Sequence, residues 1–275
     1  MIIDSHQHFW VYNPIKHSWI ADSMAAIRKD FLPADLKAIY SDQQVDGCVA
    51  VQADQTNSET DFLVKLAAET SFIRGVVGWV DLQNSNIEEL LEKRSHDKIV
   101  KGFRHIVQGE SDPNFLLRKE FLTGITALGH FDYTYDILVF PHQLVSVLEF
   151  VKKFPQQKFV LDHLAKPYVK DGFYEGWAAV MQLVAECENV SCKLSGLITE
   201  ADYKYWTSQD LHPYMELVLE AFGPSRLLFG SDWPVCLVAG TFADVKRTTE
   251  DFINKLSEDE QQKIMGINAI NFYNL

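Results

Sequence analysis

The sequence predicts a single domain over residues 1–275 with the fold of a (β/α)8 barrel of the TIM type. Eight short apolar runs recur along the chain, and stretches with helical periodicity separate most of them. No linker, low-complexity segment or internal repeat divides the sequence, and α/β barrels of this length commonly fold as one domain. We therefore expect parallel strands joined by right-handed crossover helices.

The expected strands and helices alternate in the order that such a barrel requires. The strands are predicted at residues 2–6, 46–53, 73–81, 98–105, 133–140, 158–163, 190–196 and 226–232. Crossover helices are predicted for the segments SETDFLVKLAAETS, NIEELLEKRS, PHQLVSVLEFVKKFP, YEGWAAVMQLVAECE and HPYMELVLEAFG. The last segment ends at Gly223-Pro224, which is a typical helix stop.

The segment from 10 to 36 fits this alternation less well. It is rich in aromatic and turn residues, such as Trp10, Trp19 and Pro33. We expect a long loop after the first strand, folded over the barrel mouth, and then a short helix near 33–43. The loop is either a lid over the site or a surface extension whose tryptophans pack on the body.

Composition and charge narrow the classes of partner. Apolar residues make up 47% of the chain and charged residues 23%, as in globular proteins. The formal net charge is −13 without clustered Lys and Arg, so we expect no nucleic-acid partner. No apolar run is long enough to cross a bilayer and no signal-peptide pattern is present, so we expect a cytoplasmic protein without a membrane partner. The four cysteines lack C-x-x-C spacing, which favours buried free thiols, and the oligomeric state is not indicated.

Polar residues stand at the C-terminal ends of several predicted strands, where barrels of this type carry their reacting groups. His6 and His8 are two positions apart on the first strand, so their side chains point to the same side. Further strand ends carry Arg104 and His105, Asp162 and His163, Lys193 and Ser195, and Ser231, Asp232 and Trp233. A histidine pair alone is also typical of hydrogen-bonded residues at a strand end, but the joint pattern indicates a catalytic site.

Five short motifs in the chain carry a family resemblance. They are DSHQHFW at 4–10, GFRHIVQ at 102–108, LDHLAKP at 161–167, KLSGLITEA at 193–201 and GSDWPV at 230–235. In this order and rough spacing the sequence resembles the amidohydrolase superfamily, in its branch of sugar-lactone hydrolases, over nearly the whole chain. The resemblance implies a distorted barrel that opens a lactone ring, with four residues converging on the reactive water or carbonyl: His6, His8, His163 and Asp232.

Opening a lactone requires a nucleophilic water, a stabilised oxyanion and a proton for the leaving alkoxide. We expect Asp232 to act as the general base and to pass the proton to the ring oxygen without a covalent intermediate. Positive charge or hydrogen-bond donors for the oxyanion would come from the histidines together with Arg104 or Lys193. The implied small-molecule substrate is an aldonolactone, and a 6-deoxy sugar such as L-fucono- or L-rhamnono-lactone is expected.

The need for a metal stays open at this stage. His6, His8, His163 and Asp232 match the set that holds one zinc ion in this superfamily. The bridging lysine of two-metal members is not matched, because Lys101 would face away from Arg104 in a regular strand. The enzyme would therefore use one zinc ion, or no cofactor at all with the histidines as direct donors.

Residues near the strand ends are candidates for sugar binding. The aromatic candidates are Trp10, Trp79, Phe140 and Trp233. Each could stack on the apolar face of a sugar ring or could equally belong to the core. Five polar residues are candidates for the sugar hydroxyls: Gln52, Asp81, His105, Gln108 and His142.

Two other functions compete with lactone hydrolysis. One is a zinc-dependent hydrolase or decarboxylase of the same superfamily that acts on a cyclic or aromatic-derived acid, for which several cationic groups would be needed. The other is a barrel that binds a sugar acid without catalysis. The presence of Asp232 argues against a pure binding protein, because binding alone needs no base.

Overall fold

The computed structural model describes residues 1–275 and contains one sheet of eight strands. In chain order the strands are β1 (Ile3–Gln7), β2 (Gly47–Val51), β3 (Ile73–Gly78), β4 (Val100–His105), β5 (Thr134–Ile137), β6 (Phe159–Leu161), β7 (Val190–Leu194) and β8 (Leu227–Phe229). Each strand pairs in parallel with the strand that follows it in the sequence. The predicted (β/α)8 barrel is confirmed.

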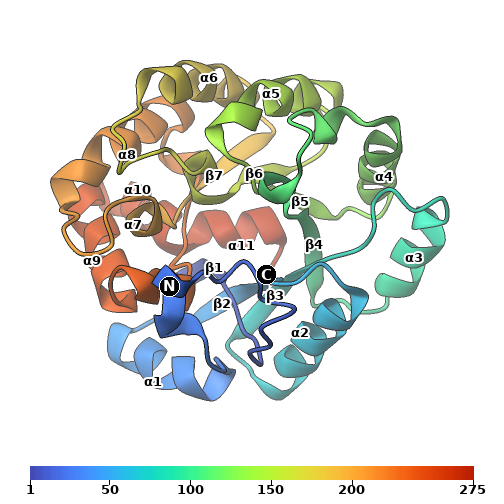
Figure 1. The fold of residues 1–275 in the computed structure, drawn as a ribbon, viewed down its shortest axis with the longest axis horizontal. Helices are drawn as coiled ribbons and strands as arrows, with labels where there is room; N and C mark the ends of the chain where they lie inside the picture. The colour runs from blue at the N-terminus through green and yellow to red at the C-terminus, as the bar shows by residue number, and fades with distance from the viewer.

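Most of the helices surround the strands and form the outer layer of the barrel (Figure 1). The helices of the chain are α1 (Pro33–Gln43), α2 (Asn57–Glu69), α3 (Ile87–Arg94), α4 (Lys119–His130), α5 (Leu144–Lys153), α6 (Glu175–Ala185), α7 (Leu197–Glu200), α8 (Ser208–Phe222), α9 (Phe242–Ile253), α10 (Glu258–Gln262) and α11 (Asn268–Tyr273). The predicted helical segments correspond to α1, α2, α3, α5, α6 and α8. Helix α8 begins earlier than predicted, because Thr207 and Asp210 form a capping box there.

The barrel closes between β1 and β8 through the turn after β8 and not through a full ladder. Gln7 forms a single parallel bridge with Trp233. The amide of Asp232 donates to the carbonyl of His6 at 2.8 Å, and the amide of His8 donates to the carbonyl of Trp233 at 2.7 Å. The barrel is distorted at this irregular closure. The closure also fixes the backbone of Asp232 beside the two histidines.

The N-terminal end of the barrel is filled and covered by α11. This short helix crosses the centre of the view in Figure 1. Its residues Ala269 and Tyr273 pack on a buried apolar layer formed by Ile3, Val49, Val51, Val77, Val160 and Leu228. Just before it, Gly266 approaches the start of the chain so closely that a Cβ atom would lie 2.4 Å from the carbonyl oxygen of Met1.

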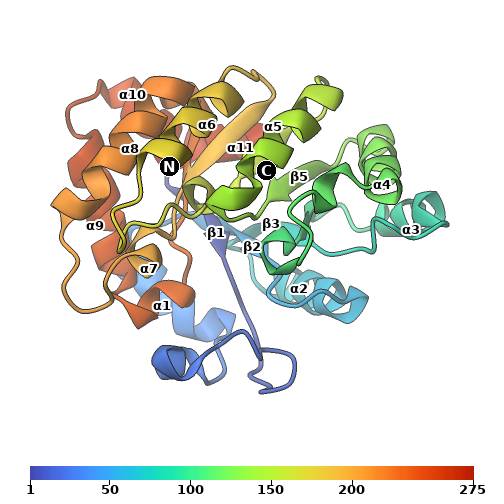
Figure 2. The same ribbon diagram turned by 45° about the horizontal axis from the view of Figure 1, so that its top comes forward.

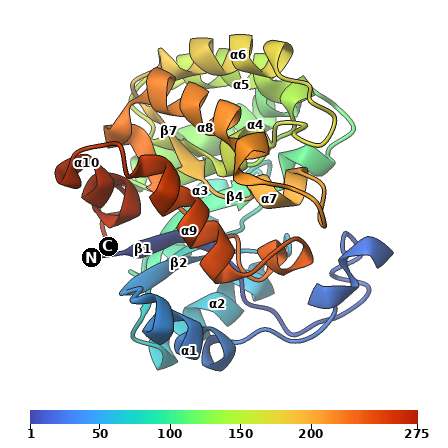
Figure 3. The same ribbon diagram turned by 90° about the vertical axis from the view of Figure 1, so that its left-hand side faces the viewer.

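The loop between β1 and α1 extends away from the body of the barrel (Figure 2). Figure 3 shows this loop on the opposite side of the barrel from the two termini. The loop is held by a bridge between Trp10 and Phe31 and contains a short 3-10 helix, η1 (Asp22–Ile27). The indole of Trp10 is buried and donates to the carbonyl of Lys29, whereas Trp19 is 40% exposed. Its predicted role as a lid stays a prediction.

Most of the predicted strands are shorter in the structure, and in two of them the expected catalytic residues lie in a turn beyond the strand. After β6, the residues from His163 to Lys166 all have positive φ angles of 50° to 56°. After β8, Asp232 has a φ of 55°. Apolar periodicity predicts an extended run but not the point at which the backbone leaves it, so both predicted strands were too long.

Two further predictions concern the state of the cysteines and the presence of membrane-spanning helices. All four cysteines are free, and Cys48, Cys192 and Cys236 are buried. None of the helices combines the length and the apolar character that a membrane span requires. A cytoplasmic location stays a prediction.

Candidate active site

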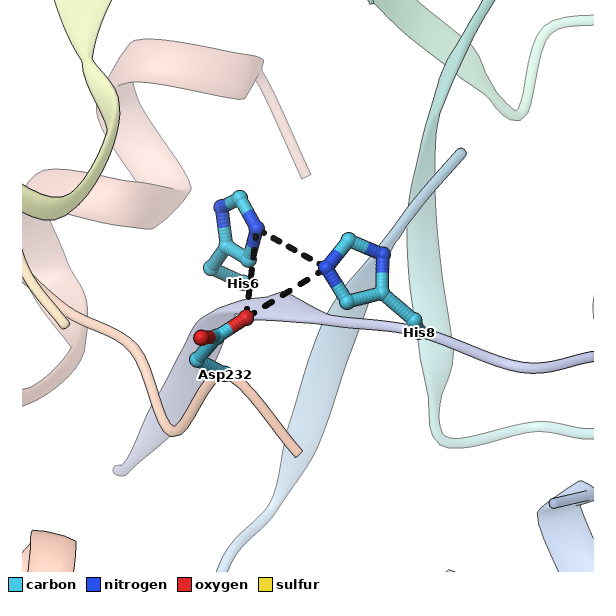
Figure 4. A group of neighbouring side chains, drawn as sticks. All are labelled: His6, His8 and Asp232. Atoms are coloured by element: carbon cyan, nitrogen blue, oxygen red, sulfur yellow. Dashed lines mark hydrogen bonds and ion pairs between the residues drawn. The ribbon is translucent and has the colours of Figure 1, made fainter. Parts of the chain in front are cut away.

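His6, His8 and Asp232 meet at the C-terminal end of the barrel (Figure 4). The Nε2 atoms of the two histidines lie 3.1 Å apart. The Oδ1 atom of Asp232 lies 3.4 Å from Nε2 of His8 and 3.9 Å from Nε2 of His6. All three side chains are buried, so their interactions are weakly screened by solvent.

The backbone of β2 sets the tautomer of His8. Its Nδ1 atom lies 2.7 Å from the carbonyl oxygen of Val51. A carbonyl oxygen only accepts hydrogen bonds, so Nδ1 carries a proton, and in the singly protonated tautomer Nε2 has a lone pair on the side of Asp232.

His6 is oriented by two residues from other strands. Its Nδ1 atom lies 3.2 Å from Oδ1 of Asp162, and its Nε2 atom lies 3.3 Å from Nη1 of Arg104. A guanidinium only donates, so we assign the proton to Nδ1 and a lone pair to Nε2. Lys193 also approaches Nδ1, at 3.1 Å, but its shorter contacts are to the carboxylates of Asp136, at 2.5 Å, and Asp162, at 2.9 Å.

A buried set of charges lies beneath His6. Arg104 and Lys193 are matched by Asp162 and Asp136, and all four side chains are buried. Burial alone would raise the pKa of Asp162, but Lys193, His6 and Arg104 outweigh it and hold this pKa well below its ordinary value. Burial raises the pKa of Asp136 to about 6, against the opposing effect of Lys193. The hydroxyl of Tyr273 donates to Asp136 at 2.8 Å, which links α11 to this set.

His163 is placed by the left-handed turn after β6. Its Nε2 atom lies 3.8 Å from Oδ1 of Asp232, and its Nδ1 atom lies 2.8 Å from the hydroxyl of Ser195. The neighbouring Gly196 has a φ of 65°, and a Cβ atom there would lie 2.5 Å from Nδ1 of His163. Only glycine fits this position without moving the imidazole.

The charge state of the site follows from these contacts. Burial lowers the pKa of His6 and that of His163 well below the ordinary value of a histidine, so both rings are neutral at neutral pH. Burial alone would raise the pKa of Asp232, but His163 and His8 outweigh it and lower this pKa. Asp232 is therefore an ionised carboxylate beside the neutral rings of His6 and His163.

Asp4 fixes the turn that carries Asp232. One carboxylate oxygen accepts from the hydroxyl of Ser231 at 2.6 Å and from Tyr40 at 2.9 Å, and the other accepts from the amide of Ser231 at 2.8 Å. Burial raises the pKa of Asp4 to about 6. Asp4 opens the first motif but is not among the predicted functional residues.

A cavity of about 320 Å³ opens above this cluster. Six residues from the sequence prediction line it: His8, Arg104, Gln108, Phe140, His163 and Asp232. Ten others that line it were not predicted, of which four are aliphatic and six are not: Trp19, Met24, Lys166, Thr199, Glu200 and Tyr203. These six residues lie in loops and in the short helices η1 and α7, where the positions of strand ends give no signal.

The donor set fits a single zinc ion. Zinc bonds of 2.0–2.1 Å in a tetrahedral site place neighbouring ligand atoms ~3.3 Å apart. His6, His8 and Asp232 present ligand atoms 3.1 to 3.9 Å apart. The Nε2 atom of His163 lies 3.8 Å from Asp232 but outside this group of three. Two imidazole lone pairs 3.1 Å apart repel each other unless a proton or a metal ion lies between them. The residues present therefore suit a divalent metal.

Comparison with known proteins identifies the family. A model of the amidohydrolase family matches residues 3–275. The chain belongs to the amidohydrolase family. It is 37% identical to an L-fucono-1,5-lactonase of Burkholderia multivorans, over 99% of this chain and 96% of that protein. It is 35% identical to an L-fucono-1,5-lactonase of Burkholderia ambifaria, over 99% of this chain and 95% of that protein.

A solved structure is similar over the whole chain. It is the crystal structure of an amidohydrolase from Burkholderia multivorans with bound zinc, which superimposes on this amidohydrolase with a TM-score of 0.96. The two chains are 37% identical, and the match covers 100% of this chain and 99% of the other.

Several predicted site residues of this amidohydrolase support the site from behind the cavity wall. Gln52 is buried, and its side-chain amide donates to the backbone carbonyl of Arg104 at 3.2 Å. The backbone carbonyl of Gln52 accepts a hydrogen bond from the guanidinium of Arg104. Lys193 is buried beneath His6 and does not line the cavity. These positions suit residues that orient Arg104 and His6, whereas the sequence analysis expected them to face the substrate.

The remaining predicted substrate residues do not line the cavity either. Trp10 and Trp233 are both buried and pack edge-to-face on Phe31. His105 contacts Glu110 at 2.7 Å, and His142 stacks on Phe140. Two further candidates, Trp79 and Asp81, lie beyond β3, where Thr60 accepts from the amide of Trp79 and Asp81 accepts from the amide of Gln83.

Proposed function

We propose that this amidohydrolase hydrolyses a neutral sugar lactone to the open sugar acid. The observation that carries the proposal is the charge balance of the cavity. Of its lining residues, Arg104 and Lys166 are cations, and Asp232 and Glu200 are the matching carboxylates. Such a cavity offers a base to a neutral substrate but no surplus of positive charge to an acid.

The substrate class follows from the relatives. The similarity to two L-fucono-1,5-lactonases extends over 99% of the chain, and the match to the solved neighbour covers 100% of this chain. An aldonolactone of a 6-deoxy sugar, such as L-fucono-lactone, is the substrate that this similarity supports. A cyclic or aromatic acid is less suited, because both cavity cations already have carboxylate partners.

Asp232 is the proposed general base. Its lowered pKa keeps it ionised at neutral pH, so it can accept a hydrogen bond from a water molecule and take its proton. The water oxygen then attacks the lactone carbonyl. The ring C–O bond breaks in the second step, and Asp232 returns the proton to the departing ring oxygen, which yields the hydroxy acid and regenerates the carboxylate.

Arg104 is the proposed electrostatic partner of the oxyanion. It lines the cavity, its position is fixed by Asp162 and by the carbonyl of Gln52, and its Nε atom has no hydrogen-bond partner. A fixed cation in a buried site needs no reorganisation as charge develops on the carbonyl oxygen. Lys193 and Asp136 act as positioning residues, because Asp136 holds Lys193, and Lys193 in turn holds Asp162, which contacts His6.

His6, His8, His163 and Asp232 are the residues that would hold a zinc ion. Zinc bound there lowers the pKa of a coordinated water molecule and polarises a carbonyl group. The bound zinc in the similar Burkholderia multivorans amidohydrolase supports this assignment.

A lactone panel tests the proposal. The purified protein is incubated in weak buffer with a pH indicator and with L-fucono-, L-rhamnono-, D-arabino- or D-galactono-lactone. We expect acid release well above the spontaneous rate for at least one lactone. Rates equal to those of the blank across the panel, with and without added zinc, would contradict the proposed function.

A further inference from the structure

An ion pair on the cavity wall has no part in the proposed reaction. The ammonium of Lys166 lies 2.7 Å from Oε1 of Glu200, and both side chains line the cavity. Lys166 comes from the turn after β6, and Glu200 ends helix α7. Their side chains are only 16% and 14% exposed, so the pair is not an ordinary surface salt bridge.

The backbone that presents Lys166 is unfavourable for its residues. His163, Leu164, Ala165 and Lys166 all adopt left-handed φ angles of 50° to 56°, although none is glycine and left-handed turns disfavour every L-residue. Strained backbone of this kind concentrates at functional sites. The turn brings both of its ends, His163 and Lys166, to the cavity wall. The proposed reaction gives a role to His163 but none to Lys166.

The wall around the pair has free hydrogen-bonding capacity. Lys166 has three ammonium hydrogens and makes one hydrogen bond, to Oε1 of Glu200, whose second oxygen has no protein partner. The Oε1 atom of Gln108, which also lines the cavity, is buried without a partner. The ammonium of Lys166 lies 5.8 Å from the centre of the Phe140 ring, so an aromatic face adjoins these polar groups.

We propose that Lys166, Glu200 and Gln108 bind the hydroxyl groups of the substrate and thereby select polyhydroxylated lactones over unsubstituted ones. This inference rests on the proposed function. A sugar hydroxyl both donates and accepts, and the ion pair offers a donor and an acceptor side by side. The pair carries no net charge, so it suits a neutral polyol, and Glu200 would repel a carboxylate. Polar groups built to bind hydroxyls discriminate strongly against analogues that lack them.

The test compares two substrates in matched variants. The wild type, Lys166→Met and Glu200→Gln are assayed on the best lactone of the panel and on δ-valerolactone, which has no hydroxyl groups. We expect the ratio of the two kcat/KM values to fall about 10- to 100-fold in each variant, as for a lost charge-assisted hydrogen bond. Lys170→Met is the control, because Lys170 pairs with Asp202 at the surface, at 3.6 Å and 63% exposed. Its ratio should equal that of the wild type.

A binding measurement complements the kinetics. By titration calorimetry, the free sugar that corresponds to the best lactone, a neutral cyclic polyol, should bind at least 10-fold more weakly to Lys166→Met and to Glu200→Gln than to Lys170→Met. Glu200→Gln keeps the shape of the side chain and an acceptor for Lys166, so it remains informative if Lys166→Met fails to fold.

The outcomes separate this inference from the proposed function. An active wild type with unchanged ratios, and unchanged affinities for the neutral sugar in the variants, would overturn hydroxyl binding by Lys166, Glu200 and Gln108 but not the proposed function. An equal loss on both substrates would also overturn hydroxyl binding, because that result indicates a catalytic or structural role. A wild type inactive on every lactone would overturn the proposed function, and this inference with it.

Discussion

His8 and Asp232 face each other across the seam where the barrel closes, with 3.4 Å between Nε2 and Oδ1. The same seam is held by backbone hydrogen bonds that join Asp232 to His6 and His8 to Trp233. The same contacts therefore close the barrel and set the geometry of the site. A change that loosens the seam is expected to impair both.

Zinc binding should depend on His8. Titration calorimetry of the metal-free protein should show one equivalent of zinc per chain, and His8→Gln should weaken this affinity by more than the ~10–100-fold typical of an outer-shell residue. His142→Gln is the control, because His142 is exposed and does not line the cavity. Equal affinities for the wild type and His8→Gln would exclude His8 as a ligand.

Ser195 should act on the rate through His163. Its hydroxyl is 2.8 Å from Nδ1 of His163 and is the only side-chain partner of that atom. In Ser195→Ala the imidazole loses its orientation, so we expect kcat to fall ~10–100-fold with little change in KM. Ser191→Ala, four residues earlier and within β7, should leave both constants unchanged. A Ser195→Ala enzyme with the wild-type kcat would show that this hydrogen bond does not position His163.

Lys193 should be essential for stability. Lys193→Met leaves Asp136 and Asp162 buried with one cation fewer, and breaking a buried pair in this way typically costs about 3–5 kcal/mol. The free energy of unfolding in urea measures this loss. Lys255→Met removes an exposed pair with Glu216 and should cost less than about 1 kcal/mol. Similar losses of unfolding free energy in the two variants would contradict the claim that the buried charges around Lys193 stabilise the fold.

Glu59 should make the stability of the protein depend on pH. Burial raises its pKa from 4.5 to about 7, so the folded state holds this proton more tightly than the unfolded state. The resulting stabilisation is complete below pH 4.5 and is lost as the pH rises through about 7.

The variant Glu59→Gln cannot ionise and keeps an acceptor for the amide of Ala53, which Glu59 binds at 3.0 Å. We expect it to be more stable than the wild type at pH 8, by up to about 3 kcal/mol. The advantage should vanish near pH 4. Urea unfolding at both pH values checks this, and a constant difference between the two proteins would refute the assignment.

The central residues of the site were predictable because they follow strands. His6, His8, Arg104, His163 and Asp232 all stand at or just beyond strand ends, and parallel strands bring those ends together. Sequence reasoning could not place Lys193 at the correct depth. Alternation shows which side of a strand a residue faces, but not whether it reaches the cavity or lies below it.

Other parts of the site had no sequence signal of this kind. Lys166 and Glu200 lie outside the strands, and their encounter depends on a left-handed turn that no periodicity encodes. Asp136 is one charged residue inside an apolar run, so its function appears only when Lys193 is seen beside it. The aromatic candidates have different environments in the structure. Phe140 lines the cavity, whereas Trp10 and Trp233 fill the core.

The turnover number of Asp232→Asn on the best lactone tests the central claim most directly. Asparagine keeps the shape of the side chain and tolerates the left-handed backbone at this position, but it cannot take a proton. We expect kcat to fall ~10²–10⁴-fold with a melting temperature close to that of the wild type, while the control Asp251→Asn, at an exposed position on α9, keeps full activity. A correctly folded Asp232→Asn enzyme that turns over the lactone at nearly the wild-type rate would show that Asp232 is not the base.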